Sequence, residues 1–229
     1  SYNKISITRD PQGEKILYYY EDKNEIIFSS EVDSIIFYLG KYEIDYNVLK
    51  SYFLTRHFTW LDKTIFKDIK ILEPGFEINI DLRTFKKKYT QKSSIRDLVN
   101  KKEYDKLNRL TEKNLINRLD LLLKKNIKEM IPHNRNFGSI FSGGIDSSLI
   151  SKYISLTAKP KEYIFINHLG KDRHTKHIKK FSKLIKKKIK IVNVDEDKYH
   201  KYLKKAVLNN YSPINSHSWV GQLIISKNI

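Results

Sequence analysis

Between residues 136 and 210, short apolar runs alternate with longer amphipathic runs, and this pattern restricts the fold more than any other feature of the sequence. The apolar runs, which predict strands, are NFGSIF (136–141), EYIFIN (162–167) and KIKIVNV (188–194). The segments after them predict helices. The first of these helices begins around Ser148, and the third lies in DEDKYHKYLKKAVLNN (195–210). The second has one apolar face, which consists of Ile178, Phe181, Leu184 and Ile185. Apolar strands that alternate with helices predict an α/β fold with a parallel sheet covered on both faces.

Residues 1–90 differ, because strands and turns predominate there. Alternating apolar residues predict strands in NKISITRD (3–10) and from Phe76 to Leu82, where a Pro74-Gly75 turn precedes the strand. The stretch KILYYYEDKNEIIFSS (15–30) predicts a hairpin. Two short helices are expected, over 33–40, where Gly40 ends the helix, and over 45–55.

A polar segment and a long helix join these two regions. Residues 91–112 show little periodicity, so we expect a connector there. Apolar residues then recur at helical spacing until Pro132 ends the pattern, at Leu115, Leu119, Leu122, Leu123, Ile127 and Met130.

The composition limits the class of protein. The 229 residues are 40% hydrophobic, so the chain can bury a core, and no run of eighteen apolar residues predicts a membrane span. With no Cys, the chain has no disulfide and no thiolate nucleophile or metal ligand of its own. The N-terminal residues lack the apolar stretch of a secretory signal, and we expect a cytoplasmic protein.

The formal net charge is +18, from 44 Lys and Arg against 26 Asp and Glu. This charge fits a nucleic-acid surface. It also fits a coding bias towards Lys, Ile, Asn and Tyr with solvated lysines, and we favour that interpretation. The dense run KLIKKKIK (183–190) is expected to be the solvated face of a helix that runs into a strand.

The stretch Ser142-Gly143-Gly144-Ile145-Asp146-Ser147-Ser148 follows the first predicted strand and opens a helix. The carboxyl edge of a parallel sheet is where α/β folds bind ligands. Glycines allow positive φ and close approach of a ligand, and the helix N-terminus supplies N–H donors for an anion. The serine hydroxyls add donors, and one carboxylate, Asp146, predicts that Mg²⁺ bridges it to a phosphate. The alternative is a plain strand-to-helix turn.

This stretch resembles the PP-loop, Ser-Gly-Gly-x-Asp-Ser, of the ATP pyrophosphatase superfamily. Arg9 to Ile36, RDPQGEKILYYYEDKNEIIFSSEVDSII, is similar to the RDxxGxxPLYY…FASEIKAL segment of glutamine-dependent asparagine synthetases. Within the following segment, Thr64-Ile65-Phe66, Ile69, Leu72, Pro74 and Gly75 stand where that family has the same residues. The resemblance runs from about Ile5 to Ile225.

The resemblance implies three regions: the β-rich C-terminal part of an Ntn-type glutaminase domain (1–92), a connector (93–112) and the first half of a HUP-like PP-loop domain (113–229). It implies ATP-dependent asparagine synthesis from aspartate and glutamine-derived ammonia through β-aspartyl-AMP. The implied ligands are ATP, Mg²⁺, aspartate and glutamine, and a homodimer is an open possibility. The implied ATP-binding residues are Ser142, Gly143, Gly144, Asp146, Ser147 and Ser148, together with Phe141 and Ile166 as adenine contacts, with Asp146 as the Mg²⁺ ligand.

Departures from the family leave alternatives open. The N-terminal Cys nucleophile, the Asn-Gly turn and the second Ser-Gly-x-Gly-x-Asp-Glu motif are absent, so we expect an internal fragment of a longer enzyme that is inactive alone. Phe141 and Ile166 equally fit strand core. A relative that amidates or cyclises another carboxylate, a tRNA-modifying PP-loop enzyme and a non-catalytic binding protein remain alternatives.

The remaining polar groups predict structural roles. His174, His177 and His200 lack a convincing zinc-site spacing. Asp195-Glu196-Asp197 is expected to cap a helix and complement its dipole. Arg9 and Asp10 are expected to form an ion pair.

Overall fold

The computed structural model describes residues 3–58, 60–168, 175–214, 216 and 218–227. The chain divides into two compact units, Ser1–Asp105 and Lys106–Ile229. Each unit has its own sheets and core, so the mixed α/β class expected from the sequence is confirmed.

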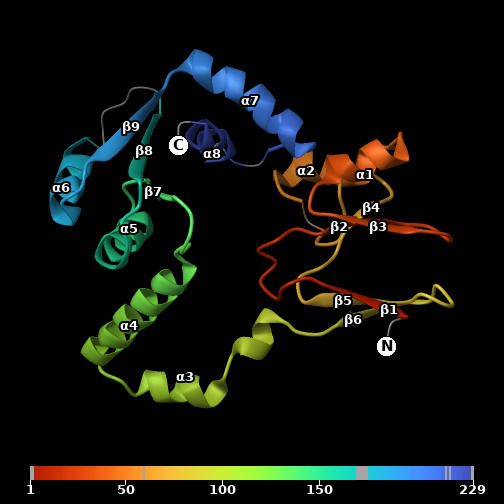
Figure 1. The fold of residues 1–229 in the computed structure, drawn as a ribbon, viewed down its shortest axis with the longest axis horizontal. Helices are drawn as coiled ribbons and strands as arrows, with labels where there is room; N and C mark the ends of the chain where they lie inside the picture. Colours follow the sequence, from red (N-terminus) through yellow and green to blue (C-terminus); the bar gives the residue numbers. More distant parts are fainter. Residues whose placement is uncertain (1–2, 59, 169–174, 215, 217, 228–229) are drawn as a thin grey trace. The chain divides into compact units, whose positions relative to one another are not determined.

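The first unit contains two small antiparallel sheets (Figure 1). One has the order β1-β5-β6, and its strands are β1 (Lys4–Thr8), β5 (Phe76–Asp81) and β6 (Lys87–Gln91). The other has the order β3-β2-β4, and its strands are β2 (Tyr18–Glu21), β3 (Ile26–Ser29) and β4 (Ile69–Ile71). The predicted strands at the N-terminus and from Phe76 and the predicted hairpin are confirmed, whereas β4 and β6 were not predicted.

Alternation along β2 sends side chains into two different cores. Tyr19 packs with Ile78 and Ile80 between the two sheets. Tyr18 and Tyr20 lie on the opposite face, in the cluster that contains Val32 and Ile35 of α1 (Val32–Leu39). The unit is therefore layered as sheet, sheet and helix, with the helix on the second sheet.

The two predicted helices of this unit are confirmed, with the ends that the sequence indicates. Helix α1 ends at Gly40, which takes the left-handed conformation with φ 66° and donates its N–H to the Ile36 carbonyl oxygen. Helix α2 (Tyr46–Thr55) begins after Asp45, whose carboxylate accepts the N–H groups of Asn47 and Val48.

The segment expected as a connector contains helical structure that the sequence analysis did not predict. A 3-10 turn, η1 (Ile95–Leu98), starts with a capping box between Ser94 and Asp97, and α3 spans Lys101–Asn108. Neither element buries a residue. Because the sequence analysis relied on apolar periodicity, helices without a buried face gave no signal.

The second unit is built on a parallel sheet in the order β7-β8-β9, whose strands are β7 (Gly138–Phe141), β8 (Glu162–His168) and β9 (Ile189–Val194). Helices follow the strands as expected, as α5 (Ile145–Thr157), α6 (Thr175–Ile185) and α7 (Glu196–Asn210). The long helix α4 (Glu112–Met130) precedes β7.

Both faces of this sheet carry a core, which confirms the expected covering (Figure 1). On one face Tyr163 and Phe165 pack with apolar residues of α6. On the other, Ile164 packs with α7 and with α8 (Ser218–Ser226), a helix that was not predicted. Leu184, expected on the buried face of α6, is 59% exposed instead, because it lies at the wall of a cavity.

No helix in the described part of the chain combines the length and the apolar character that crossing a bilayer requires.

Candidate functional site

The turn from Ser142 to Gly144 connects the carboxyl end of β7 to the first residue of α5. Gly143 has φ 83°, a left-handed conformation that favours glycine. Gly144 is the N-cap of α5 in extended conformation and has no side chain to cap the helix, while the Ser142 hydroxyl oxygen accepts the Gly144 N–H at 3.5 Å. The N–H groups of the first helical turn have no intrahelical acceptor, so this end of α5 presents donors for an anion.

The serine hydroxyls brace the turn. The Ser142 and Ser147 hydroxyl oxygens lie 2.8 Å apart, and the Ser147 hydroxyl oxygen accepts the Ser142 N–H at 3.2 Å. The Ser148 hydroxyl donates to the Gly144 carbonyl oxygen at 2.6 Å. These hydrogen bonds hold the backbone of the turn in shape, and the role of the hydroxyls as ligand donors stays a prediction.

A second serine pair, which the sequence analysis missed, fastens α5 to β7. The hydroxyl oxygens of Ser139 and Ser151 are 3.0 Å apart, and both residues are buried. This hydrogen bond fixes the middle of α5 against the strand before the turn. The sequence does contain a signal for this pair: a serine lies within the predicted strand, and another lies within the helix that follows.

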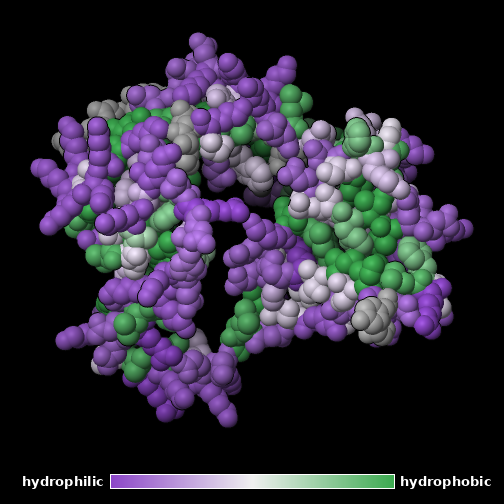
Figure 2. Space-filling view, viewed as in Figure 1, coloured by the Kyte–Doolittle hydropathy of each residue, from purple (hydrophilic) through white to green (hydrophobic). Residues whose placement is uncertain are grey.

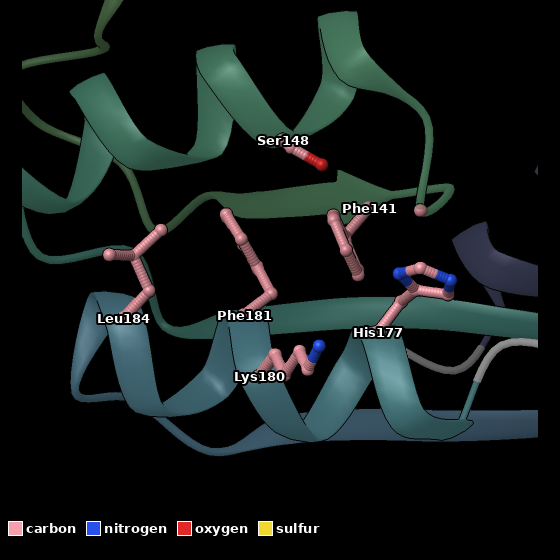
Figure 3. Close-up of a pocket in the computed structure, with 7 residues that line it drawn as sticks. Phe141, Ser148, His177, Lys180, Phe181 and Leu184 are labelled. Atoms are coloured by element: carbon pink, nitrogen blue, oxygen red, sulfur yellow. The ribbon is translucent and has the colours of Figure 1, made fainter.

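Next to the turn lies a cavity of about 390 Å³ between α5 and α6. Figure 3 shows Ser148 on α5 across the cavity from the α6 side chains. Its lining residues come from the strand, the turn and the two helices, and are Phe141, Gly143, Ser148, His177, Lys180, Phe181 and Leu184. Three lining residues on α6, His177, Lys180 and Leu184, were not identified as part of this site from the sequence. They are far from the turn in the sequence and come close to it only in the folded chain.

Phe141 fits the strand-core interpretation, and its role as an adenine contact stays a prediction. Its side chain is only 1% exposed and stacks on Phe181, with ring centroids 4.4 Å apart and planes 8° apart, so it belongs to the core. It also lines the cavity. Ile166 is paired with Val192 in the β8-β9 register, but its side chain lies outside the described part of the structure.

Asp146 is exposed in the first turn of α5. The described residues contain no group of three or more His, Cys, Asp or Glu side chains that could hold a metal ion. A single carboxylate still suits Mg²⁺, because this ion is commonly held by one or two carboxylates together with substrate phosphates and water. The turn therefore fits a metal that arrives with a phosphate ligand and does not form an all-protein metal site.

The expectation for Asp195 has a clear outcome. Capping by Asp195 is confirmed, because its carboxylate accepts the Lys198 N–H at 2.7 Å at the start of α7. Among the histidines considered for zinc, His174 lies outside the described residues.

The predicted ion pair between Arg9 and Asp10 is wrong. The Arg9 guanidinium donates to the carbonyl oxygens of Leu72, Lys15 and Gly13, at 2.6, 2.9 and 3.0 Å. The Asp10 carboxylate accepts the N–H groups of Glu14, Lys15 and Gln12. These backbone hydrogen bonds, that from Glu14 foremost, lower the pKa of Asp10. Both residues shape the loop before β2, and backbone groups satisfy each of them separately.

Comparison with known proteins agrees with the sequence resemblance for the first unit. Residues 1–91 match the family described as a glutamine amidotransferase domain. Over 169 residues the chain is 25% identical to "Asparagine synthetase [glutamine-hydrolyzing] 2" of Bacillus subtilis (strain 168). The matched part is 66% of this chain and 21% of that relative, so the chain spans about a fifth of the relative's length.

Proposed function

We propose that this chain, whose first 91 residues match a glutamine amidotransferase domain, belongs to an enzyme that uses ATP to activate a carboxylate for amidation. The carboxylate proposed first is that of aspartate, with glutamine-derived ammonia as the nitrogen donor and asparagine as the product. Amidation or cyclisation of another carboxylate fits the same site and is the closest alternative. The distant likeness to an asparagine synthetase supports the proposal.

One observation carries the ATP-dependent part: the glycine turn at the carboxyl end of a parallel strand. Gly143 has positive φ, and the N-cap of α5 is Gly144, which has no side chain of its own to cover the N–H groups of the first helical turn. In our proposal, the N–H groups from Gly143 to Ser147 hold the phosphates of ATP, and Asp146 holds Mg²⁺ against them. The bound Mg²⁺ would neutralise phosphate charge.

The chemistry explains why an amidating enzyme needs such a site. A carboxylate is a poor electrophile, because it is negatively charged and has no good leaving group. Transfer of AMP to one carboxylate oxygen, with release of pyrophosphate, supplies that leaving group, and ammonia then displaces AMP. A turn that binds the pyrophosphate stabilises the departing group as the bond to the α-phosphorus breaks.

Gly144→Ala separates the stability of the turn from its binding role. Gly144 has φ −77°, which alanine adopts freely, and an added Cβ would meet only the Ser142 hydroxyl oxygen, at 3.6 Å. The free energy of unfolding should therefore change by less than about 1 kcal/mol. ATP and pyrophosphate should bind about tenfold more weakly, because the methyl group displaces phosphate from charge-assisted backbone hydrogen bonds. Thermal unfolding and equilibrium titration measure the two effects.

Leu156→Ala is the control for this experiment, since Leu156 is exposed near the other end of α5 and lies outside the cavity. It should leave the affinity for ATP unchanged. A Gly144→Ala variant that folds and binds ATP as tightly as the unaltered chain would remove the turn from the proposed nucleotide site.

A second candidate, a tRNA-modifying enzyme with the same turn, is favoured by the net charge of +18. The structure supports the interpretation that the lysines of the dense basic run, 183–190, are solvated. Ile185 and Ile189 are buried in this run. Its exposed lysines are Lys183, Lys186, Lys187, Lys188 and Lys190. Hydrophilic side chains also cover most of the face seen in Figure 2. Sequence-specific RNA recognition requires aromatic side chains that stack on bases beside the cations.

We therefore expect RNA binding to be weak, independent of sequence and steeply reduced by salt. Titration with one tRNA and with bulk RNA, at low and at physiological salt, tests this expectation. Tight binding at physiological salt that prefers the tRNA would place the tRNA-modifying function first.

A further inference from the structure

We propose that Lys180 on α6 is a second phosphate-binding element of the site and contacts the polyphosphate of the ligand from the side opposite the glycine turn. This inference rests on the proposed function, because it assigns a further residue to the same nucleotide site. Sequence patterns give no indication of it, since Lys180 follows the turn by more than thirty residues and belongs to a lysine-rich helix.

Packing of α6 fixes which of its residues reach the cavity. Ile178, Phe181 and Ile185 are buried against the sheet, and the Phe181 ring stacks on Phe141. With the helix held in this rotation, His177, Lys180 and Leu184 lie along the cavity wall at a spacing of three or four residues, which is one helix face. In Figure 3, His177 and Leu184 extend from α6 below Phe141 and Ser148, and Lys180 lies along α6 between them.

The charges around the cavity favour an anion. Lys180 contributes an ammonium group, and none of the seven lining residues is an acid. Within the described part of the chain, no ion pair joins a carboxylate to Lys180. The opposite wall contains Gly143 and Ser148 at the start of α5, where the helix dipole is positive. A ligand between these walls meets positive potential from two elements, the Lys180 ammonium group and the N-terminus of α5.

Neighbouring lysines on α6 allow a test that separates a direct contact from general charge. Lys179 is exposed and does not line the cavity, whereas Lys180 does. Lys179→Met and Lys180→Met remove the same charge and leave side chains of similar size at adjacent positions. A purely electrostatic attraction by the basic surface would respond similarly to both changes.

Calorimetric titration of the whole chain with ATP, inorganic pyrophosphate and adenosine, each with Mg²⁺, measures the contact. Lys180→Met should weaken the binding of ATP and of pyrophosphate about tenfold, the loss of one charge-assisted hydrogen bond. Lys179→Met should change neither affinity by more than about twofold, because its charge is screened by solvent. Lys180→Arg should retain most of the affinity, and adenosine binding should be the same in all variants.

The outcomes distinguish the two proposals. If the unaltered chain binds ATP and pyrophosphate but Lys180→Met binds them equally well, the Lys180 contact is wrong and the proposed function stands. Equal losses in Lys179→Met and Lys180→Met also contradict the contact, since they indicate general charge. If the unaltered chain binds neither polyphosphate, both proposals fail. Since Lys180 is exposed, thermal unfolding should be unchanged, which excludes misfolding as the cause of a loss.

Discussion

Gly75→Ala should lower the free energy of unfolding of the first unit by about 3 kcal/mol or more, a sum of left-handed strain and forced displacement of packed backbone. Gly75 has φ 76°, and an added Cβ would overlap the Ser93 carbonyl oxygen and lie 2.9 Å from the Ser93 carbonyl carbon. Neither partner is a flexible side chain, so the backbone itself must move.

That movement would disturb hydrogen bonds at the start of β5. The Gly75 carbonyl oxygen accepts the N–H groups of Lys92 and Ser93, at 2.8 and 3.3 Å, and the Gly75 N–H donates to the Asp10 carbonyl oxygen at 3.1 Å. Each lost backbone hydrogen bond adds about 1 kcal/mol. The turn before β5 therefore depends on glycine for both its conformation and its close packing.

Gly40→Ala is the matched control. Gly40 also has positive φ, 66°, but an added Cβ would meet no heavy atom within 4 Å. It should cost only about 1 kcal/mol, the strain of alanine in the left-handed conformation. Urea unfolding followed through Trp60, in a Trp219→Phe background, reports on the first unit. Equal losses from the two substitutions would show that the overlap at Ser93 relaxes at little cost.

The second unit was predictable from sequence because its elements bury apolar residues in regular patterns. The run EYIFIN is apolar enough to predict a strand, and its alternation sends Tyr163 and Phe165 to one core and Ile164 to the other. The α6 pattern likewise predicted four buried residues, and three of them, Ile178, Phe181 and Ile185, are buried. It failed for Leu184, since periodicity distinguishes one helix face from another but does not distinguish a packed face from a cavity wall.

Elements without such patterns were missed. Strand β6, KKYTQ, lies at the edge of its sheet, where one side is unpaired and lysines are common.

Helix α4 was predicted, but the burial of its apolar face was not. Its apolar residues predicted the helix correctly, yet only Ile127 is buried, while Leu115, Leu119, Leu122 and Met130 are exposed. Helical period alone did not indicate how much of that face is covered.

The candidate site likewise has one part that the sequence predicted and another part that only the structure shows. The turn from Ser142 to Ser148 is contiguous, so a local pattern was enough to single it out. Lys180 and His177 come to the cavity only through the packing of α6 on the sheet. The Ser139–Ser151 hydrogen bond likewise depends on how α5 lies against β7. These residues required the structure because nothing in their local sequence marks them.

Asp146→Ala should have the largest effect on ligand binding, a loss of about 100-fold or more in the affinity for ATP with Mg²⁺, because it removes the one carboxylate in the turn. In the absence of Mg²⁺ the same variant should bind ATP as well as or better than the unaltered chain, since a negative charge beside the phosphates is gone. The variant should thus lower the affinity for ATP only when Mg²⁺ is present, which distinguishes loss of a metal ligand from damage to the turn.

Glu196→Ala is the control, since Glu196 is an acid in the first turn of another helix, α7. It changes the net charge by the same amount and should leave ATP binding unaltered with and without Mg²⁺. A loss of affinity in Asp146→Ala that is equal in both conditions would contradict a role for Asp146 in holding the metal.

Titration of the unaltered chain with ATP, in the presence and absence of Mg²⁺ and beside pyrophosphate and adenosine, tests most directly whether the glycine turn is a nucleotide phosphate site. We expect ATP and pyrophosphate to bind, Mg²⁺ to tighten both about tenfold or more, and adenosine to bind far more weakly, because the turn and Lys180 present their donors to phosphate. Binding of adenosine as tight as that of ATP, or no binding of either polyphosphate with Mg²⁺ present, would contradict the proposal.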